Sequence, residues 1–327
     1  MIEAPNADAL MAGELGQWLA AQNADRAAAK AKAARIVWFA LLAAVAAAFV
    51  VVLVTGRPIT GLQVGFFLGL GGFAWAEWSK RPVLNRLKGG INGAIARSLG
   101  LDYSVECQPG KTFERAKQFD MVPDYDDSTF CDLWWGLVAG QPFTLHEAKL
   151  TEQRGSGKDR RTVTVFEGQI LSIGFNRRFH STTLIEPDGE RRKFLIGAEK
   201  ETADIGGIEL GRVDVTHPGF EDRFTAWSDD QVEARYIVHP EYVERLLAVE
   251  KAFTGEDIRA LFHEGDLLIT VKTGNLFESG SLDSGDDRAL LSKAIVQFTA
   301  LADLAITLNE RARSTLADLG PAQGSAQ

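Results

Sequence analysis

The stretch ITGLQVGFFLGLGGFAWA, residues 59–76, contains no charged side chain, and neither does IVWFALLAAVAAAFVVVLV, residues 36–54. Each is about as long as a helix that crosses a hydrocarbon core of roughly 30 Å. The turn between them, residues 55–58, is short, so the two helices are neighbours. A cleaved signal peptide does not fit this pattern, because the first apolar run is too long and a second follows at once. We therefore expect a transmembrane hairpin over residues 36–78.

The orientation of the hairpin is predicted from the basic residues beside it. Four precede the first span, four follow the second, and the turn carries only Arg57: Arg26, Lys30, Lys32 and Arg35, then Lys80, Arg81, Arg86 and Lys88. Lys and Arg are retained on the cytoplasmic side of a membrane. Both termini and the rest of the chain are therefore expected in the cytoplasm.

Glycines recur in the second span at positions 61, 65, 69 and 72. Gly61, Gly65 and Gly69 share one helical face, and small residues on such a face let another helix approach closely. Packing within the hairpin is the simpler interpretation, because the first span offers alanines, and a dimer seam is the alternative. A channel or pump would carry ionisable residues at mid-membrane depth, which the spans lack. The hairpin is therefore interpreted as an anchor.

The rest of the chain divides around the anchor. Residues 1–35 are Ala-rich and are expected to form a helical stem, and residues 79–99 a juxtamembrane helix that Gly89 and Gly90 interrupt. Residues 318–327 are expected to be a disordered tail. Residues 100–317 remain as a cytoplasmic domain.

Strand signals dominate the first part of that domain. CDLWWGLVAG and QPFTLHEAKLTEQ flank a Gly-Gln-Pro turn, and RTVTVFEGQILSIGF is rich in β-branched and aromatic residues. Shorter candidates are STTLIEP, RKFLIG and IELGRVDVT, and IRALFHE and DLLITVKT flank a turn at Gly265. Helices are expected after a Ser228 cap, over 241–253 and over 285–317. Strands followed by helices, joined by short loops, indicate an α+β fold with a mainly antiparallel sheet.

Basic residues gather at three predicted turns of an otherwise acidic chain, whose net charge is −9. They are Arg154, Lys158, Arg160 and Arg161 in the first turn, Arg177 and Arg178 in the second, and Arg191, Arg192 and Lys193 in the third. Such turns could contact anionic lipid headgroups, or they could be ordinary solvated hairpin ends. Nucleic acid is not expected as a partner, because the chain is acidic and lacks a recognition motif.

No catalytic, cofactor or metal motif emerges from the sequence. RGSGKDR lacks the first glycine and the Ser or Thr of a phosphate-binding loop, and the five histidines show no metal-ligand spacing. A reducing compartment argues against a disulfide between Cys107 and Cys131, and two cysteines alone do not make a zinc site. The alternative of an enzyme assembled from distant residues rests on Cys131, His146 and His180.

Three blocks resemble a bacterial membrane-anchored family, domain-of-unknown-function family 3137. The first block is Val165, Phe166, Gly168, Phe175, Phe179 and Pro187; the second is Phe220, Phe224, Asp230, Glu233, Ala234, Arg235 and Pro240; the third is Leu276, Phe277 and Glu278. The chain departs from the family pattern at Trp227 and His239. The resemblance implies an architecture with two spans ahead of the domain and a place in the bacterial inner membrane, but no activity, substrate or catalytic residue.

The sequence therefore favours a membrane-anchored binding or scaffold module for a protein or anionic lipid partner at the inner leaflet. A membrane-bound enzyme and a structural homo-oligomer remain as alternatives.

Overall fold

The computed structural model describes residues 4–174, 180–189, 201–215, 218–238 and 256–317, with a few further positions between 240 and 247. The chain forms two compact units. The helical unit comprises Asn6–Ala94 with Glu278–Lys293, and the sheet unit comprises Ile95–Phe277 with the chain from Ala294 onward. The predicted strand over 192–197, most of the predicted helix over 241–253 and the predicted tail over 318–327 lie outside the described residues.

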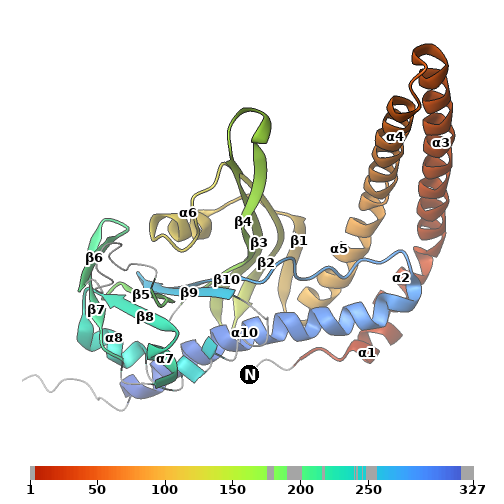
Figure 1. The fold of residues 1–327 in the computed structure, drawn as a ribbon. Helices are drawn as coiled ribbons and strands as arrows, with labels where there is room; N and C mark the ends of the chain where they lie inside the picture. Colours follow the sequence, from red (N-terminus) through yellow and green to blue (C-terminus); the bar gives the residue numbers. More distant parts are fainter. Residues whose placement is uncertain are drawn as a thin grey trace, which may run out of the picture. The chain divides into compact units, whose positions relative to one another are not determined.

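The helical unit begins with three helices in succession (Figure 1). They are α1 (Ala7–Ala12), α2 (Glu14–Ala21) and α3 (Asn23–Thr55). Asn6 caps α1 through its side-chain oxygen, which accepts from the backbone N–H groups of Asp8 and Ala9. The helix α3 is 33 residues long and carries the end of the stem and the first apolar span without a break.

A tight turn then returns the chain along α4 (Pro58–Trp78). Gly56 closes α3 in the left-handed conformation, with φ 65°, which glycine adopts without steric penalty. Pro58 is suited to the first turn of α4, where its missing N–H is not needed. The short turn between two uncharged runs thus produces the expected hairpin.

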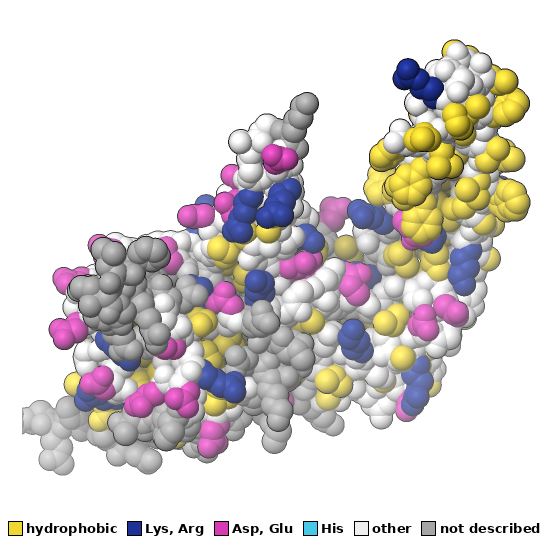
Figure 2. Space-filling model, in the orientation of Figure 1, with side chains coloured by type: hydrophobic (Ala, Val, Ile, Leu, Met, Phe, Trp, Pro, Cys, Tyr) yellow, Lys and Arg dark blue, Asp and Glu magenta, His cyan; other side chains and the backbone are white. Residues whose placement is uncertain are grey.

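Both helices of the hairpin are long and apolar enough to span a membrane. Their large side chains face outward; Phe39, Val54 and Leu62 are each at least 70% exposed, and Figure 2 shows apolar side chains covering the upper part of α3 and α4. A water-soluble surface rarely exposes a continuous apolar area of this kind. The two helices therefore indicate that the protein is associated with a membrane.

The juxtamembrane helix differs from its prediction. The helix α5 (Arg81–Ser98) continues through Gly89 and Gly90 without interruption. A Cβ atom at Gly90 would lie 2.2 Å from the indole ring of Trp18 on α2. Gly90 is required for the close approach of α2, and this packing offsets the weak helix propensity that suggested a break.

The sheet unit contains one antiparallel sheet with the described order β1-β2-β3-β4-β10-β9-β5-β8-β7-β6. Its strands are β1 (Leu101–Glu106), β2 (Asp127–Val138), β3 (Gln141–Arg154), β4 (Arg161–Gly174), β5 (Thr183–Pro187), β6 (Thr202–Ile205), β7 (Ile208–Val213), β8 (Phe224–Ser228), β9 (Glu256–His263) and β10 (Asp266–Lys272). The first four form a meander, and β10 then pairs with β4, so the α+β fold and the antiparallel sheet are confirmed.

Helices cover the two faces of this sheet. On one face, α6 (Lys111–Gln118) packs Phe113 and Ala116 into a core with Ala148 and Leu150 of β3. On the other face, Phe298 of the long final helix α10 (Asp287–Ala317) lies 4.6 Å from Trp134, measured between ring centroids. The side chains of successive β3 residues therefore point to opposite faces of the sheet, one covered by α6 and the other by α10.

Local contacts explain one glycine and one helix cap. Gly168 lies where β4 approaches β10 closely, because an added Cβ would meet the Val271 carbonyl oxygen at 2.1 Å. The predicted cap at Ser228 is wrong: Asp230 caps the helix α8 (Gln231–Ile237) by accepting from Val232 and Glu233. An Asp side chain at this position satisfies two N–H groups of the first helical turn, and the Gln231 side chain donates to the carbonyl oxygen of Arg212.

Candidate functional site

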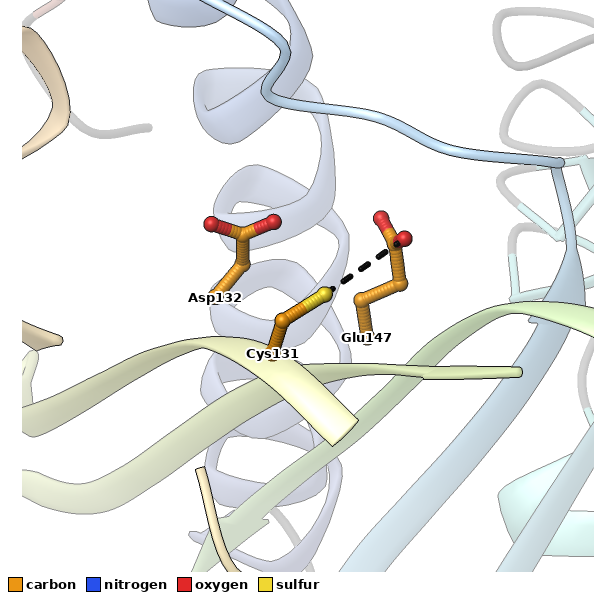
Figure 3. A group of neighbouring side chains, drawn as sticks. All are labelled: Cys131, Asp132 and Glu147. Atoms are coloured by element: carbon orange, nitrogen blue, oxygen red, sulfur yellow. Dashed lines mark hydrogen bonds between the residues drawn. The ribbon is translucent and has the colours of Figure 1, made fainter. Parts of the chain in front are cut away.

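A bulge in the sheet brings together three side chains that sequence analysis did not connect. The register between β2 and β3 shifts between Cys131 and Trp134, and Asp132 there has φ 57°. In a regular strand, Cys131 and Asp132 would point to opposite faces. Figure 3 shows that both instead extend to the same side of the sheet as Glu147 of β3, with Cys131 directed at Glu147. Bulges commonly re-aim a side chain in this way.

The donor atoms of these residues converge. The Cys131 Sγ, one carboxylate oxygen of Asp132 and one of Glu147 all lie within 4.8 Å of one another. The Cys131 thiol is 3.7 Å from Glu147 Oε1. Asp132 and Glu147 are buried and Cys131 is half-buried. We call Cys131, Asp132 and Glu147 the bulge cluster.

Neighbouring groups hold the two carboxylates in place. The Tyr103 hydroxyl of β1 donates to Asp132 Oδ1. Glu147 Oε2 accepts from Gln169 Nε2 and from the backbone N–H of Leu276, each at 3.1 Å. Glu147 Oε1 is therefore the oxygen directed at Cys131. The pairing of Glu147 with Gln169 follows from the register of β3 and β4.

The second cysteine, Cys107, is not part of the cluster. Burial, and secondarily the negative charge of Asp132, raise the pKa of Cys107 to about 11. Its thiol donates to the carbonyl oxygen of Gln108 at 3.3 Å. Cys107 therefore stays protonated at neutral pH, whereas the Cys131 sulfur faces a carboxylate that it can donate to. A thiol and two carboxylates in a buried position are suited to hold a proton or a metal cation.

The structure does not bring the proposed enzyme residues together. His146 directly precedes Glu147 on β3 and therefore lies on the opposite face from Cys131, with its ring 6.1 Å from that of Phe130. Burial lowers the pKa of His146 to about 4. His180 lies three residues before β5, and its backbone N–H donates to the carboxylate of Glu233. Cys131, His146 and His180 thus occupy three separate environments.

One of the three basic turns lies in the described part of the chain. The β2–β3 pairing ends at Asp127 and Thr151, and the β4–β10 pairing ends at Gly168 and Lys272. The end of the β3–β4 hairpin therefore extends beyond both neighbouring strands, and Figure 2 shows basic side chains along it. We call residues 152–163 the basic arm. Arg177, Arg178, Arg191, Arg192 and Lys193 lie outside the described residues.

Two arginines of the basic arm face each other. Arg154 pairs directly with Arg161 in the register of the hairpin, and both are exposed, as is Arg160. Lys158 belongs to the short 3-10 turn at the tip. Like charges at directly opposed positions of a hairpin destabilise it, and an ion pair between Arg154 and Glu152, at 2.9 Å, offsets part of this repulsion.

The residues of the bulge cluster carry no recognisable spacing in the sequence, for a physical reason. Cys131 and Asp132 are adjacent, and Glu147 is 15 positions past Asp132, on another strand. Nothing in their spacing resembles a metal-binding motif. The predictive signal is the strand pair itself: a turn at residues 139–140 places residue 147 opposite residue 132, and the bulge moves it opposite residue 131.

Together, these features define an α+β protein with two apolar helices of membrane-spanning length. Residues 164–310 match the sequence model of a family described as "Protein of unknown function (DUF3137)", which confirms the resemblance over that part of the chain. No curated protein matches the chain. A solved structure, "crystal structure of the mycobacterial trehalose monomycolate transport factor A, TtfA", is 13% identical with a TM-score of 0.34, over 68% of this chain and 93% of that chain. A likeness of this size assigns neither fold nor function.

Proposed function

We propose that this protein is a membrane-anchored binding module of the bacterial inner membrane, with both termini and the sheet unit in the cytoplasm. The two apolar helices support the anchor, and the distribution of Lys and Arg around them supports the orientation. In this proposal Gly61, Gly65 and Gly72 pack α4 against α3. An added Cβ would meet Ala48 of α3 at Gly61, Ala44 at Gly65 and Ala40 at Gly72. An added Cβ at Gly69 would meet no atom within 4 Å.

The binding surface in this proposal is the basic arm, and its partner is the anionic lipid headgroup. The observation that carries it is the direct opposition of Arg154 and Arg161 on an exposed hairpin end. Arginines at directly opposed positions of a hairpin repel each other, and a phosphate bound between them would replace that repulsion with attraction. Each cation near an anionic surface adds about 1 kcal/mol of attraction. Lys158 and Arg160 would add to this, and Glu152 and Asp159 offset part of it.

Hydrogen–deuterium exchange of the full chain in lipid nanodiscs tests the basic arm. We expect exchange in residues 152–163 to be slower in nanodiscs that contain anionic lipid than in nanodiscs of zwitterionic lipid alone. The difference should shrink when the salt concentration rises from 50 mM to 500 mM, because salt screens exposed charges.

A charge-reversal variant supplies the matched comparison. Arg154→Glu with Arg160→Glu and Arg161→Glu should abolish the protection by anionic lipid. Lys111→Glu with Arg235→Glu changes two exposed basic residues elsewhere in the sheet unit and should leave it intact. Equal exchange of the arm in both lipids would reject the lipid contact and direct the search to a protein partner.

The orientation has its own test. A single exposed cysteine introduced at Gly157, in a variant with Cys107 and Cys131 replaced by serine, should be labelled by a membrane-impermeant maleimide only after the cells are opened. Labelling in intact spheroplasts would place the sheet unit on the outer side and contradict the proposed orientation.

A further inference from the structure

The bulge cluster has the composition of a metal site. We propose that Cys131, Asp132 and Glu147 bind one divalent transition-metal ion of the Zn²⁺ class. The donors are the Cys131 thiolate, one oxygen of Asp132 and Glu147 Oε1. The site is independent of the basic arm and of the membrane anchor, because all three donors lie on β2 and β3 next to the bulge.

The distances between the donors suit such an ion. Zinc binds sulfur at about 2.3 Å and carboxylate oxygen at about 2.0–2.2 Å, so tetrahedral donors lie about 3.5 Å apart. The Cys131 Sγ and Glu147 Oε1 are 3.7 Å apart, and no pair of donors exceeds 4.8 Å. The largest separation between donors exceeds the tetrahedral value by about 1 Å, and small rotations of the side chains would close this difference.

A buried amide beside the cluster supplies a second observation. Gln169 is fully buried, and its Nε2 donates to Glu147 Oε2. Its Oε1 has no hydrogen-bond partner within the part of the chain that the structure describes. Leaving a buried carbonyl oxygen unsatisfied costs roughly 1–3 kcal/mol. The amide lies against the Glu147 carboxylate through its nitrogen, so in this proposal its unsatisfied oxygen, in the same buried environment, is the candidate for the fourth position.

The surrounding hydrogen bonds are of the kind that orient metal ligands. Tyr103 fixes one oxygen of Asp132, and Gln169 and Leu276 fix Glu147 Oε2, which leaves Oε1 directed inward. Outer groups of this type set the direction and basicity of the ligands. The left-handed backbone at Asp132, φ 57°, aligns its side chain with that of Cys131.

The donor types select the class of ion. A thiolate is a soft ligand, which disfavours Mg²⁺ and Ca²⁺, and the mixture of one sulfur with oxygens suits Zn²⁺ or Co²⁺. A cation would also neutralise two carboxylates held close together in a buried position. Cys107 is not a ligand in this proposal, because its sulfur is not among the converging donor atoms and its thiol donates to the carbonyl oxygen of Gln108.

Cobalt titration of the full chain in detergent, after removal of any purification tag and treatment with chelator, tests the site. We expect Co²⁺ to produce a near-ultraviolet thiolate-to-cobalt band that saturates at one ion per chain. One equivalent of Zn²⁺ should remove the band. The absence of a thiolate band in the wild-type protein would overturn the proposal, whatever the variants do.

The two cysteines provide a matched pair of variants. Cys131→Ser should abolish the thiolate band, and Cys107→Ser should retain it. The opposite result would overturn the assignment of the ligand. Asp132→Asn and Glu147→Gln keep the shape of each side chain and should weaken Co²⁺ binding by at least about tenfold, and Gln169→Leu by about 10- to 100-fold.

Thermal unfolding gives a readout that does not depend on the spectrum. Zn²⁺ should raise the unfolding temperature of the wild-type protein, because a ligand that binds only the folded state stabilises it. The Cys107→Ser variant should respond in the same way, and the Cys131→Ser variant should not. An equal response of both variants would place the ion elsewhere in the chain and reject the site.

Discussion

His146 is buried as a neutral ring on the α6 face of β3. It is 3% exposed, its Nε2 has no hydrogen-bond partner within the described residues, and burial lowers its pKa from 6.5 to about 4. In the unfolded chain the ring would regain its ordinary pKa. Between pH 6.5 and pH 4 the unfolded state therefore binds a proton that the folded state excludes, and stability is lost as the pH falls through this range.

We expect His146→Leu to remove this contribution. The free energy of unfolding of the variant, relative to the wild-type protein, should rise by about 3 kcal/mol between pH 7 and pH 4. Chemical unfolding of both proteins in detergent at several pH values measures the difference, and groups that the two proteins share cancel in it. Parallel pH profiles would show that His146 is protonated in the folded protein.

At the scale of single elements, the hairpin contains two adjacent glycines with different surroundings. A Cβ at Gly72 would lie 2.0 Å from the Cβ of Ala40 on α3, whereas a Cβ at Gly71 would meet no atom within 4 Å. Ala40 has no side chain that can move aside, so its backbone would have to shift. Gly72→Ala should therefore separate α3 from α4, and Gly71→Ala should not.

Thermal unfolding of the full chain in detergent compares the two substitutions. Gly72→Ala should destabilise the hairpin by about 1–3 kcal/mol, the usual cost of overpacking. Gly71→Ala should leave the unfolding temperature unchanged or slightly higher, because alanine favours a helix. Equal effects of the two variants would contradict the packing of the hairpin in this structure.

Sequence patterns predicted elements best where one signal dominated. Three features were predicted: the uncharged spans, the β2–β3 and β9–β10 hairpins, and the final helix. In these segments the length of the apolar run or the regular spacing of apolar residues decides the structure. The continuity of α5 was not predicted, since the role of Gly90 depends on Trp18, 72 residues earlier. The short strands β1, β6 and β8 were missed for a similar reason: pairing with neighbours defines them more than their own composition does.

At the scale of the whole chain, the order of the strands lies beyond the sequence pattern. Short loops predicted a meander, and β1 to β4 follow it, but β4 pairs with β10. The choice of β10 depends on long-range packing, including the close approach at Gly168. The bulge cluster depends in turn on the register of this sheet. A motif search fails here because the donors become neighbours only after β2, β3 and β4 have paired.

The helical unit also joins distant parts of the chain through a buried ion pair. Arg26 of α3 donates to Asp287, the first residue of α10, at 2.9 Å, and both side chains are almost fully buried. Burial raises the pKa of Asp287 more than the hydrogen bond and charge of Arg26 lower it. Arg26 and Asp287 are 261 positions apart in the sequence, and each stabilises the charged form of the other in a buried position.

Removal of one partner should be far more harmful than removal of both. Asp287→Asn leaves the Arg26 charge buried without a counter-charge and should destabilise the protein by about 3–5 kcal/mol, and Arg26→Met should have a comparable effect. The double variant Arg26→Met with Asp287→Leu should recover most of that loss, because an apolar pair has no charge to desolvate. Asp8→Asn breaks the neighbouring Arg288–Asp8 pair, which is about two-thirds exposed, and should leave unfolding unchanged within error. Urea unfolding of the four variants in detergent measures their free energies of unfolding. If the double variant loses as much stability as the two single variants together, Arg26 and Asp287 are not coupled.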